Sequence, residues 1–208
     1  MISNESQAII GTRFISFAVM KITSKIIAIL LVALVLTACG SKWNVKVDLA
    51  PEERAAAQTE IEDMEAAIKN FIGPQGEIPA LQIIRLAKAY EKLGNFSKAI
   101  DVYNGWVKDH RAKSLVNNLG RLYEQVGETE LAVRQYQRII EEYFDTDYLY
   151  DITWAYIKGA KAATKAETRL EFRKKAEKYF NAWQLDKKRT DEQTQQAIKE
   201  LREGEKSK

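Results

Sequence analysis

The sequence predicts an all-α fold: a right-handed α-solenoid of about three helix hairpins, with a capping helix at each end. The composition favours helices, because only three prolines and ten glycines interrupt 208 residues. Two segments, 86–106 and 119–139, align with each other without a gap. The two segments begin 33 residues apart. A repeat of this length is typical of stacked units, which bury their apolar faces only against their neighbours.

Residues 1–38 have the plan of a secretory signal peptide. Two lysines precede the apolar run 26–36, and two small residues follow it. The run is shorter than the roughly 20 residues that a membrane-spanning helix needs. Residues 1–19 fit this plan badly, so we expect translation to start at Met20; a long basic region before the apolar run is the alternative.

Cys39 is the only cysteine in the chain, so it cannot close an internal disulfide. The preceding residues complete the stretch Leu36-Thr37-Ala38-Cys39, which resembles the lipobox of bacterial lipoproteins. In that family the chain is cut before the cysteine, whose thiol takes a diacylglycerol and whose amino group is often acylated. The resemblance implies that Cys39 is a lipidation site. The alternative is an ordinary cleaved signal peptide with an accidental cysteine.

The same resemblance implies a location in the cell envelope. Several acyl chains, each contributing about 0.8 kcal/mol per buried CH2, would anchor the protein firmly to a membrane. Lipoproteins of this type face the periplasm in a two-membrane bacterium, or the outside of the cell in a single-membrane one. Gly40, rather than aspartate, follows the cysteine, which favours the outer membrane.

Residues 39–208 are enough for one domain and are nearly neutral. Removing the three basic residues and the one acidic residue within 1–38 from totals of 32 and 29 leaves 29 and 28, a formal charge of +1. This balance argues against nucleic acid as a partner and against a polybasic lipid-binding segment. No phosphate loop, metal-ligand cluster or nucleophile motif occurs, so we expect no cofactor and no enzymatic activity.

The segment before the repeats is predicted to hold a tether and one helix. Residues 39–50 form a lipid-anchored tether, an extended spacer whose end alternates apolar and polar residues; a short strand is the alternative. Pro51 suits the first turn of a helix, which we expect to run to Phe71 within a capping segment 51–78. Two glycines and two prolines then break the helix, and Pro79 opens the next one.

The region 79–205 is predicted to hold the repeats and the C-terminal capping helix, from Thr190 to Glu203. The aligned units share an aromatic residue in the first helix, a glycine at the turn, and an alanine and an aromatic residue in the second helix. The positions that carry this pattern are Tyr90, Gly94, Ala99, Tyr103, Gly120, Tyr123, Gly127, Ala132 and Tyr136. The two turn glycines suit the left-handed conformation that ends a helix.

These units resemble the tetratricopeptide repeat, an antiparallel helix pair of about 34 residues. They depart from it in lacking the early tryptophan, the late small residue of the second helix and the closing proline. A third, divergent unit contains Ala176 and Phe180 in place of Ala132 and Tyr136, after an insertion within 159–169.

Stacked repeats of this kind present a surface lined by the first helix of each unit. The residues expected to line it are Ile84, Lys88, Glu91, Asn117, Arg121, Glu124, Tyr150, Trp154 and Ile157. Mixed charge beside aromatic residues suits a helical or extended protein segment with some positive charge. Some of these residues, Trp154 among them, could instead pack only against neighbouring helices.

His110, the only histidine, is far from Cys39 in the sequence, but a catalytic pair is conceivable because such partners meet in space. It is better explained as a residue at the end of a helix, where a cation is favoured. The sequence therefore predicts a membrane-anchored scaffold or adaptor that binds a protein in an envelope assembly complex. The alternative is a structural lipoprotein that contacts the cell wall or a glycan. The oligomeric state is left open.

Overall fold

A computed structural model describes residues 42–71, 80–108 and 112–206 of the chain. All the described helices belong to one compact unit, residues 43–208. These helices are α2 (Pro51–Asn70), α3 (Ala80–Lys92), α4 (Phe96–Val107), α5 (Lys113–Gln125), α6 (Thr129–Tyr143), α7 (Tyr148–Ala162), α8 (Ala166–Lys187) and α9 (Glu192–Lys206). Within the described ranges no residue is in a strand.

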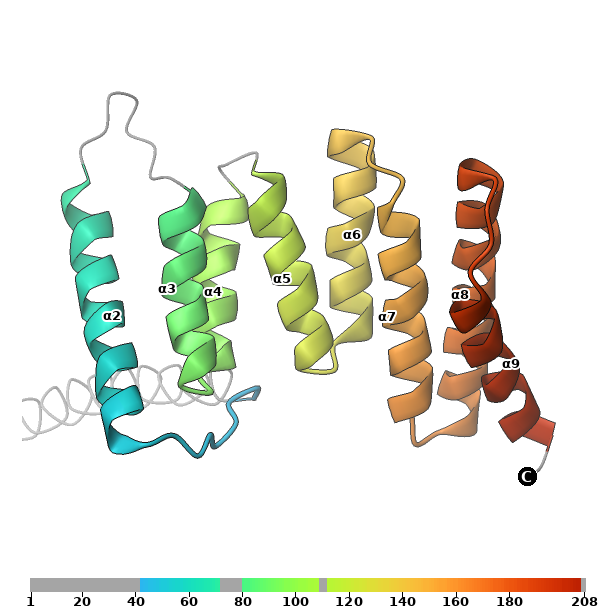
Figure 1. Ribbon diagram of the computed structural model, residues 1–208, viewed down its shortest axis with the longest axis horizontal. Helices are drawn as coiled ribbons and strands as arrows, with labels where there is room; N and C mark the ends of the chain where they lie inside the picture. Colours follow the sequence, from blue (N-terminus) through green and yellow to red (C-terminus); the bar gives the residue numbers. More distant parts are fainter. Residues whose placement is uncertain (1–41, 72–79, 109–111, 207–208) are drawn as a thin grey trace, which may run out of the picture. The chain divides into compact units, whose positions relative to one another are not determined.

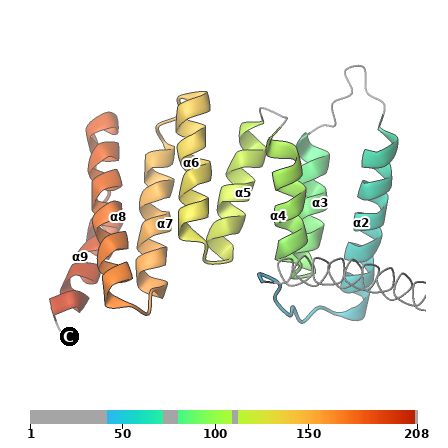
Figure 2. The same cartoon turned by 180° about the vertical axis from the view of Figure 1, so that it is seen from behind.

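The helices of this unit stand in a row, each packed mainly against its neighbours in sequence (Figures 1 and 2). Three hairpins, α3–α4, α5–α6 and α7–α8, are flanked by α2 at one end and α9 at the other. The all-α solenoid with a capping helix at each end is therefore confirmed. None of the helices in the described part is both long and apolar enough to cross a membrane.

The first two hairpins turn at glycines with a left-handed backbone. Gly94 has φ +73° and Gly127 has φ +78°, as their place after a helix predicted. Asn95 follows the first of them and caps α4, because its side-chain oxygen accepts the N–H of Lys98 at 3.3 Å. Each hairpin thus reverses direction within a few residues.

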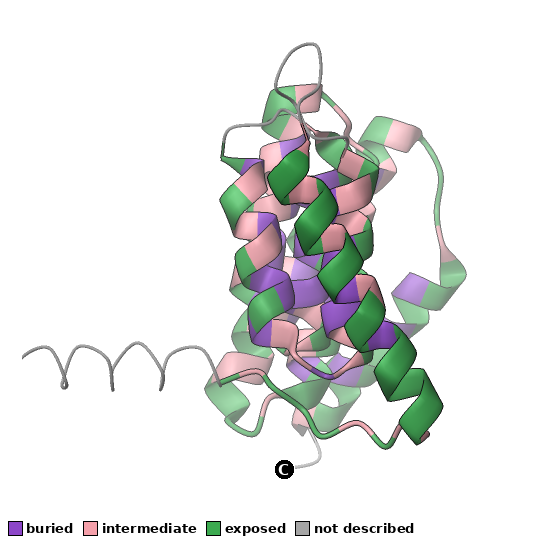
Figure 3. Cartoon of the chain, turned by 90° about the vertical axis from the view of Figure 1, so that its left-hand side faces the viewer, coloured by how far each residue is buried: buried purple, intermediate pink, exposed green. Residues whose placement is uncertain are grey.

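The core lies between the helices, where small residues on one helix leave room for bulky side chains of a neighbouring helix. Figure 3 shows the buried segments facing inward between the helices and the exposed segments facing outward. Ala99, Ala132 and Ala176 are fully buried at equivalent positions of the three second helices. A Cβ atom on Gly120 would lie 2.6 Å from Cε1 of Tyr136, so this position needs glycine for the ring to pack there.

The tyrosines at one repeated position of the first helices all bond to the helix before their hairpin. Each hydroxyl pairs with a polar side chain: Tyr90 donates to Glu65 of α2, Tyr123 accepts from Asn104 of α4 at 3.2 Å, and Tyr156 donates to Glu130 of α6 at 3.2 Å. The same position of the repeat therefore joins consecutive units along the row.

The third hairpin absorbs the predicted insertion by lengthening its helices. Relative to the second hairpin, α7 continues four residues beyond the equivalent end of α5, and α8 begins seven residues before the equivalent start of α6. These extensions together account for the expected insertion. The tip of this hairpin, 163–165, consequently projects beyond the other turns (Figure 1).

The C-terminal helix α9 covers the last hairpin and is held by charges. Its apolar side is formed by Ala197, Ile198 and Leu201, all buried, as the sequence predicted for a capping helix. Arg173 of α8 is largely buried and donates to Glu205 of α9 at 2.8 Å and to Glu177 at 2.6 Å. The start of α9 is two residues later than expected.

The segment before α2 has no regular secondary structure over residues 44–50, yet it is bound to the helical unit. We call residues 43–47 the strap. Its Val45 N–H donates to the carbonyl of Gly94 at 2.9 Å, and its Trp43 indole donates to Glu128 at 3.0 Å. The strap therefore packs against the turns of the first two hairpins, where the sequence suggested a spacer.

Candidate binding groove

A hollow of about 440 Å3 lies between the first helices of the second and third hairpins. We call it the central hollow. It is lined by Asn117, Arg121, Glu124, Gln125, Tyr136, Asp151 and Lys158. Three of the residues predicted to line a partner groove, Asn117, Arg121 and Glu124, thus come together on α5.

Glu124 bonds to side chains of two other helices at the central hollow. Its carboxylate accepts the hydroxyl of Tyr136 at 2.6 Å and the ammonium group of Lys158 at 2.6 Å. The three groups come from α5, α6 and α7, so the contact connects both hairpins. Charge-assisted bonds of this kind are shorter and stronger than bonds between neutral groups, and they fix the carboxylate in place.

Asp151 of α7 lines the same hollow as Glu124 and is exposed there. Loss of water, reinforced by the charge of Glu124, raises the pKa of the Asp151 carboxyl above its ordinary value. The charges of Arg121 and Lys158 oppose that rise. The hollow thus holds two carboxylates and two cations, and a cationic group brought to Asp151 would stabilise its charged form.

The first hairpin contains the counterpart of this arrangement without its hydrogen bond. Glu91 and Tyr103 occupy the positions of Glu124 and Tyr136. Tyr103 is fully buried, and its hydroxyl has no hydrogen-bond partner within the described residues. Burial raises the pKa of the Glu91 carboxyl, and burial together with the charge of Glu91 raises the pKa of Tyr103. Lys88, also predicted to line the groove, is exposed beside Glu91 on α3.

This difference gives a matched pair of substitutions. Tyr136→Phe is expected to lower the free energy of unfolding by about 2 kcal/mol, because it removes a buried hydroxyl that donates to a carboxylate. Tyr103→Phe is expected to cause no loss, because it removes a buried hydroxyl that makes no hydrogen bond within the described part of the chain. Urea unfolding of both variants measures the difference, and equal losses would contradict it.

The two aromatic residues predicted for the groove lie elsewhere. Tyr150 is half-buried, with its ring centroid 4.9 Å from that of Trp183 and its hydroxyl 3.2 Å from Asp191. Trp154 is also half-buried, with its ring centroid 6.5 Å from that of Tyr150. Tyr150 thus contacts the C-terminal end of the stack, and Trp154 packs against Tyr150 and the core. The repeat pattern does not reveal how the last helix covers its neighbour.

Two apolar residues expected on the same surface are also displaced. Ile157 is fully buried, and Ile84 is half-buried against the core. Conversely, Gln125 and Lys158 line the central hollow without having been predicted. Gln125 and Lys158 occupy equivalent positions of consecutive units, near the ends of α5 and α7. The alignment of the repeats that pairs the tyrosines therefore also pairs these two residues. The repeat alignment was thus the signal that could have identified both residues in the sequence.

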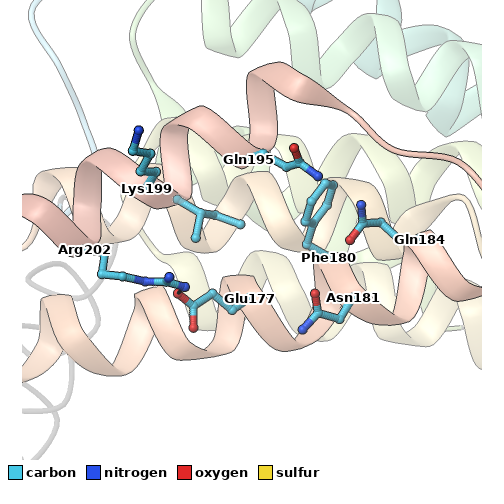
Figure 4. A pocket seen from close by; sticks show the side chains of 8 residues that line it. Glu177, Phe180, Asn181, Gln184, Gln195, Lys199 and Arg202 are labelled. Carbon is cyan, nitrogen blue, oxygen red and sulfur yellow. Dashed lines mark hydrogen bonds and ion pairs between the residues drawn. The ribbon is translucent and has the colours of Figure 1, made fainter.

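Two further hollows adjoin these helices. One of about 410 Å3 shares Glu124, Gln125 and Lys158 with the central hollow and extends along the lengthened third hairpin. The other, of about 330 Å3, lies between α8 and α9 (Figure 4). Arg202 and Glu177 form an ion pair of 2.7 Å at its edge. This last hollow belongs to the contact between the capping helix and the third hairpin.

No group of three or more histidine, cysteine, aspartate or glutamate side chains in the described ranges could hold a metal ion. Cys39 and His110, the two residues considered for reaction chemistry, both lie outside those ranges. What the described residues offer is a hydrogen-bonded polar hollow between rigid helices, a surface suited to binding.

Two segments of the chain, residues 82–112 and 114–145, match the family model of the tetratricopeptide repeat. They coincide with the hairpins α3–α4 and α5–α6, so the repeats inferred from the sequence alignment are confirmed. A search of curated proteins gave no significant match. The central hollow begins on the second matched repeat and is completed by α7 of the third hairpin.

Proposed function

We propose that this protein is a membrane-anchored, non-enzymatic scaffold or adaptor lipoprotein that binds a protein segment in an envelope assembly complex. Tetratricopeptide repeats suggest a protein-interaction scaffold, and two such repeats are present. The observation that carries the proposal further is the central hollow, where residues of three helices surround one fixed carboxylate.

The charges of the hollow indicate what kind of segment it would bind. Lys158 and Tyr136 already satisfy Glu124, whereas Asp151 is exposed at the same hollow and makes no such ion pair with Lys158; its pKa is raised by partial burial and by the charge of Glu124. A lysine or arginine of a partner would reach this exposed carboxylate and stabilise its charged form, while Arg121 at the exposed rim would meet a partner carboxylate or backbone carbonyl. We therefore infer a helical or extended segment that carries positive charge.

The proposed anchor is supported by sequence. The stretch Leu36-Thr37-Ala38-Cys39 follows a short apolar run that two lysines precede. In bacterial lipoproteins, the family that this stretch resembles, such a cysteine carries the lipid. We propose that the lipid on Cys39 holds the scaffold on the outer membrane, facing the periplasm.

Crosslinking in a bacterial host tests the binding surface. A photoreactive residue at Arg121, on α5, is expected to capture one dominant protein. The matched control is Arg134 on α6, which is also exposed but lies outside the central hollow. At that position we expect at least fivefold less of the same product.

Equal yields at Arg121 and Arg134 would contradict the central hollow as the binding surface. Capture of glycan strands in place of a protein at Arg121 would favour the alternative of a lipoprotein that contacts the cell wall. Mass spectrometry of the purified products distinguishes these results.

A further inference from the structure

The strap is held by a set of specific contacts along one edge of the solenoid. Trp43 donates its indole N–H to Glu128, and its ring meets that of Tyr123 edge-on, with centroids 6.2 Å apart. Asn44 accepts the backbone N–H of Ser97 at 3.2 Å. The strap thus contacts the turn of the first hairpin and the turn of the second.

Gly94 shows how closely the strap approaches the first turn. A Cβ atom at this position would lie 2.0 Å from the carbonyl oxygen of Val45 and 2.7 Å from Cγ2 of Val47. At Gly127, the equivalent turn glycine, a Cβ atom would meet no atom within 4 Å. At the other end of the strap, Arg54 of α2 donates to the carbonyl of Val47 at 3.0 Å. The first turn is therefore shaped around the strap.

We call the edge that contains the turns 93–95, 126–128 and 163–165 the turn edge. The strap and these turns lie along the same side of the row of helices in Figures 1 and 2. The opposite edge contains the end of α6 and the end of α8. The two edges of the solenoid are thus distinguished by where the chain enters it.

We propose that the strap fixes the orientation of the solenoid on the membrane, with the turn edge against the lipid surface. This inference depends on the proposed lipid anchor at Cys39. Trp43 follows Cys39 by four residues, and four residues of fully extended chain span at most about 14 Å. A lipid on Cys39 would therefore place the docked strap, and with it the first two turns, next to the bilayer.

The third hairpin supplies a second point of contact on the same edge. The extra four residues of α7 lengthen it by about 6 Å, so its tip reaches beyond the equivalent position of α5. Lys161 and Lys165 flank this tip, and both are exposed. Lysines at a lipid surface are attracted to anionic head groups. The strap and this tip together would hold the row of helices upright at two separated points.

This orientation has a consequence for the proposed partner. Gln125 and Lys158, which line the central hollow, belong to the ends of α5 and α7 nearest the turn edge. A segment bound there would lie within a few helical turns of the bilayer and alongside it. The scaffold would therefore receive a partner that is itself close to the membrane surface.

Single cysteines in the membrane-bound lipoprotein test the orientation. Cys39 is the only native cysteine, so once it carries lipid an introduced cysteine is the only free thiol. Thr164→Cys places a fluorescent label on the tip of the third hairpin, and Glu141→Cys places it near the opposite edge. We expect a quencher attached to lipid head groups to quench the label at position 164 at least threefold more strongly.

The strap itself is tested with the same labels. Trp43→Ala combined with Asn44→Ala removes two hydrogen bonds and one ring contact of the strap and is expected to abolish most of the difference between positions 164 and 141. Lys46→Ala, an exposed position of the strap, is the control and should retain the difference. Circular dichroism of each variant checks that the helices remain folded.

Three results would overturn the proposal, and flotation of the membranes separates them. Protein that does not float with membranes contradicts the lipid anchor, and the orientation with it. Membrane-bound protein with equal quenching at both positions contradicts the orientation alone. A quenching difference that survives loss of the strap contacts would show that another surface orients the solenoid.

Discussion

Replacing Gly94 by alanine is expected to lower the free energy of unfolding by about 2–3 kcal/mol, the sum of a backbone and a contact contribution. A residue with a Cβ atom loses about 1–2 kcal/mol in the left-handed conformation that Gly94 adopts. In addition, the new Cβ atom would overlap the carbonyl oxygen of Val45 and displace the strap, at the cost of a backbone hydrogen bond worth about 1 kcal/mol. Urea unfolding of the purified protein measures the loss.

Gly127→Ala is the matched control for that substitution. Its φ is nearly the same as that of Gly94, but a Cβ atom there would have open space around it. We expect it to lose only the backbone contribution, about 1–2 kcal/mol. The excess loss at Gly94 reports the docking of the strap, so equal losses at the two glycines would contradict that contact.

Replacing Cys39 by alanine is expected to release essentially all of the protein from membranes. The acyl chains that the thiol and the new amino group would carry supply the proposed anchoring energy, and alanine can accept no thioether-linked lipid. The melting temperature of the helical part should not change, because every described core contact lies C-terminal to position 41. Fractionation of cells by centrifugation measures the release.

Trp43→Ala serves as the control for the anchor. It loosens the strap but leaves the cysteine in place, so this variant should stay in the membrane fraction. Retention of Cys39→Ala in membranes would show that the protein is attached in some other way. Loss of Trp43→Ala from membranes would show that the strap, rather than a lipid, holds the protein there.

The repeating part of the fold could be predicted because each unit places the same residue types at the same positions of its two helices and its turn. Tyr123 occupies the position of Tyr90 in the next unit, and both hydroxyls reach the helix that precedes their hairpin. The turn glycines were identifiable from their place at the end of a helix, and both have positive φ. The packing role of Gly120 was also predictable, because a small residue at that position leaves room for a bulky aromatic side chain opposite it.

The insertion shows where this reasoning stops. Its length followed from the offset between Ala132 and Ala176, but the sequence did not indicate whether a loop or longer helices would accommodate it. The segment 159–169 is rich in alanine and lysine, which favour helices, and both helices of the hairpin are longer than their counterparts. Composition within the insertion was therefore more informative than its position between two helices.

The candidate site was predictable only in part, because its residues depend on contacts between units. Asn117, Arg121 and Glu124 followed from their spacing on one helix. Tyr150 was assigned to the groove on the same grounds, yet it contacts Trp183 of α8 and Asp191, the residue before α9. Whether a residue is covered by a later helix is a tertiary property, which spacing along one helix does not determine.

The strap also determines the order in which the molecule is completed. Most contacts in the row of helices join neighbours in sequence, so a hairpin can form as soon as its own residues are available. Trp43 and Glu128 are 85 residues apart, and their contact closes a much longer loop. During synthesis Trp43 emerges first, yet its binding site is complete only when the second turn has folded. The earliest segment of the solenoid to be made is thus among the last to reach its final place.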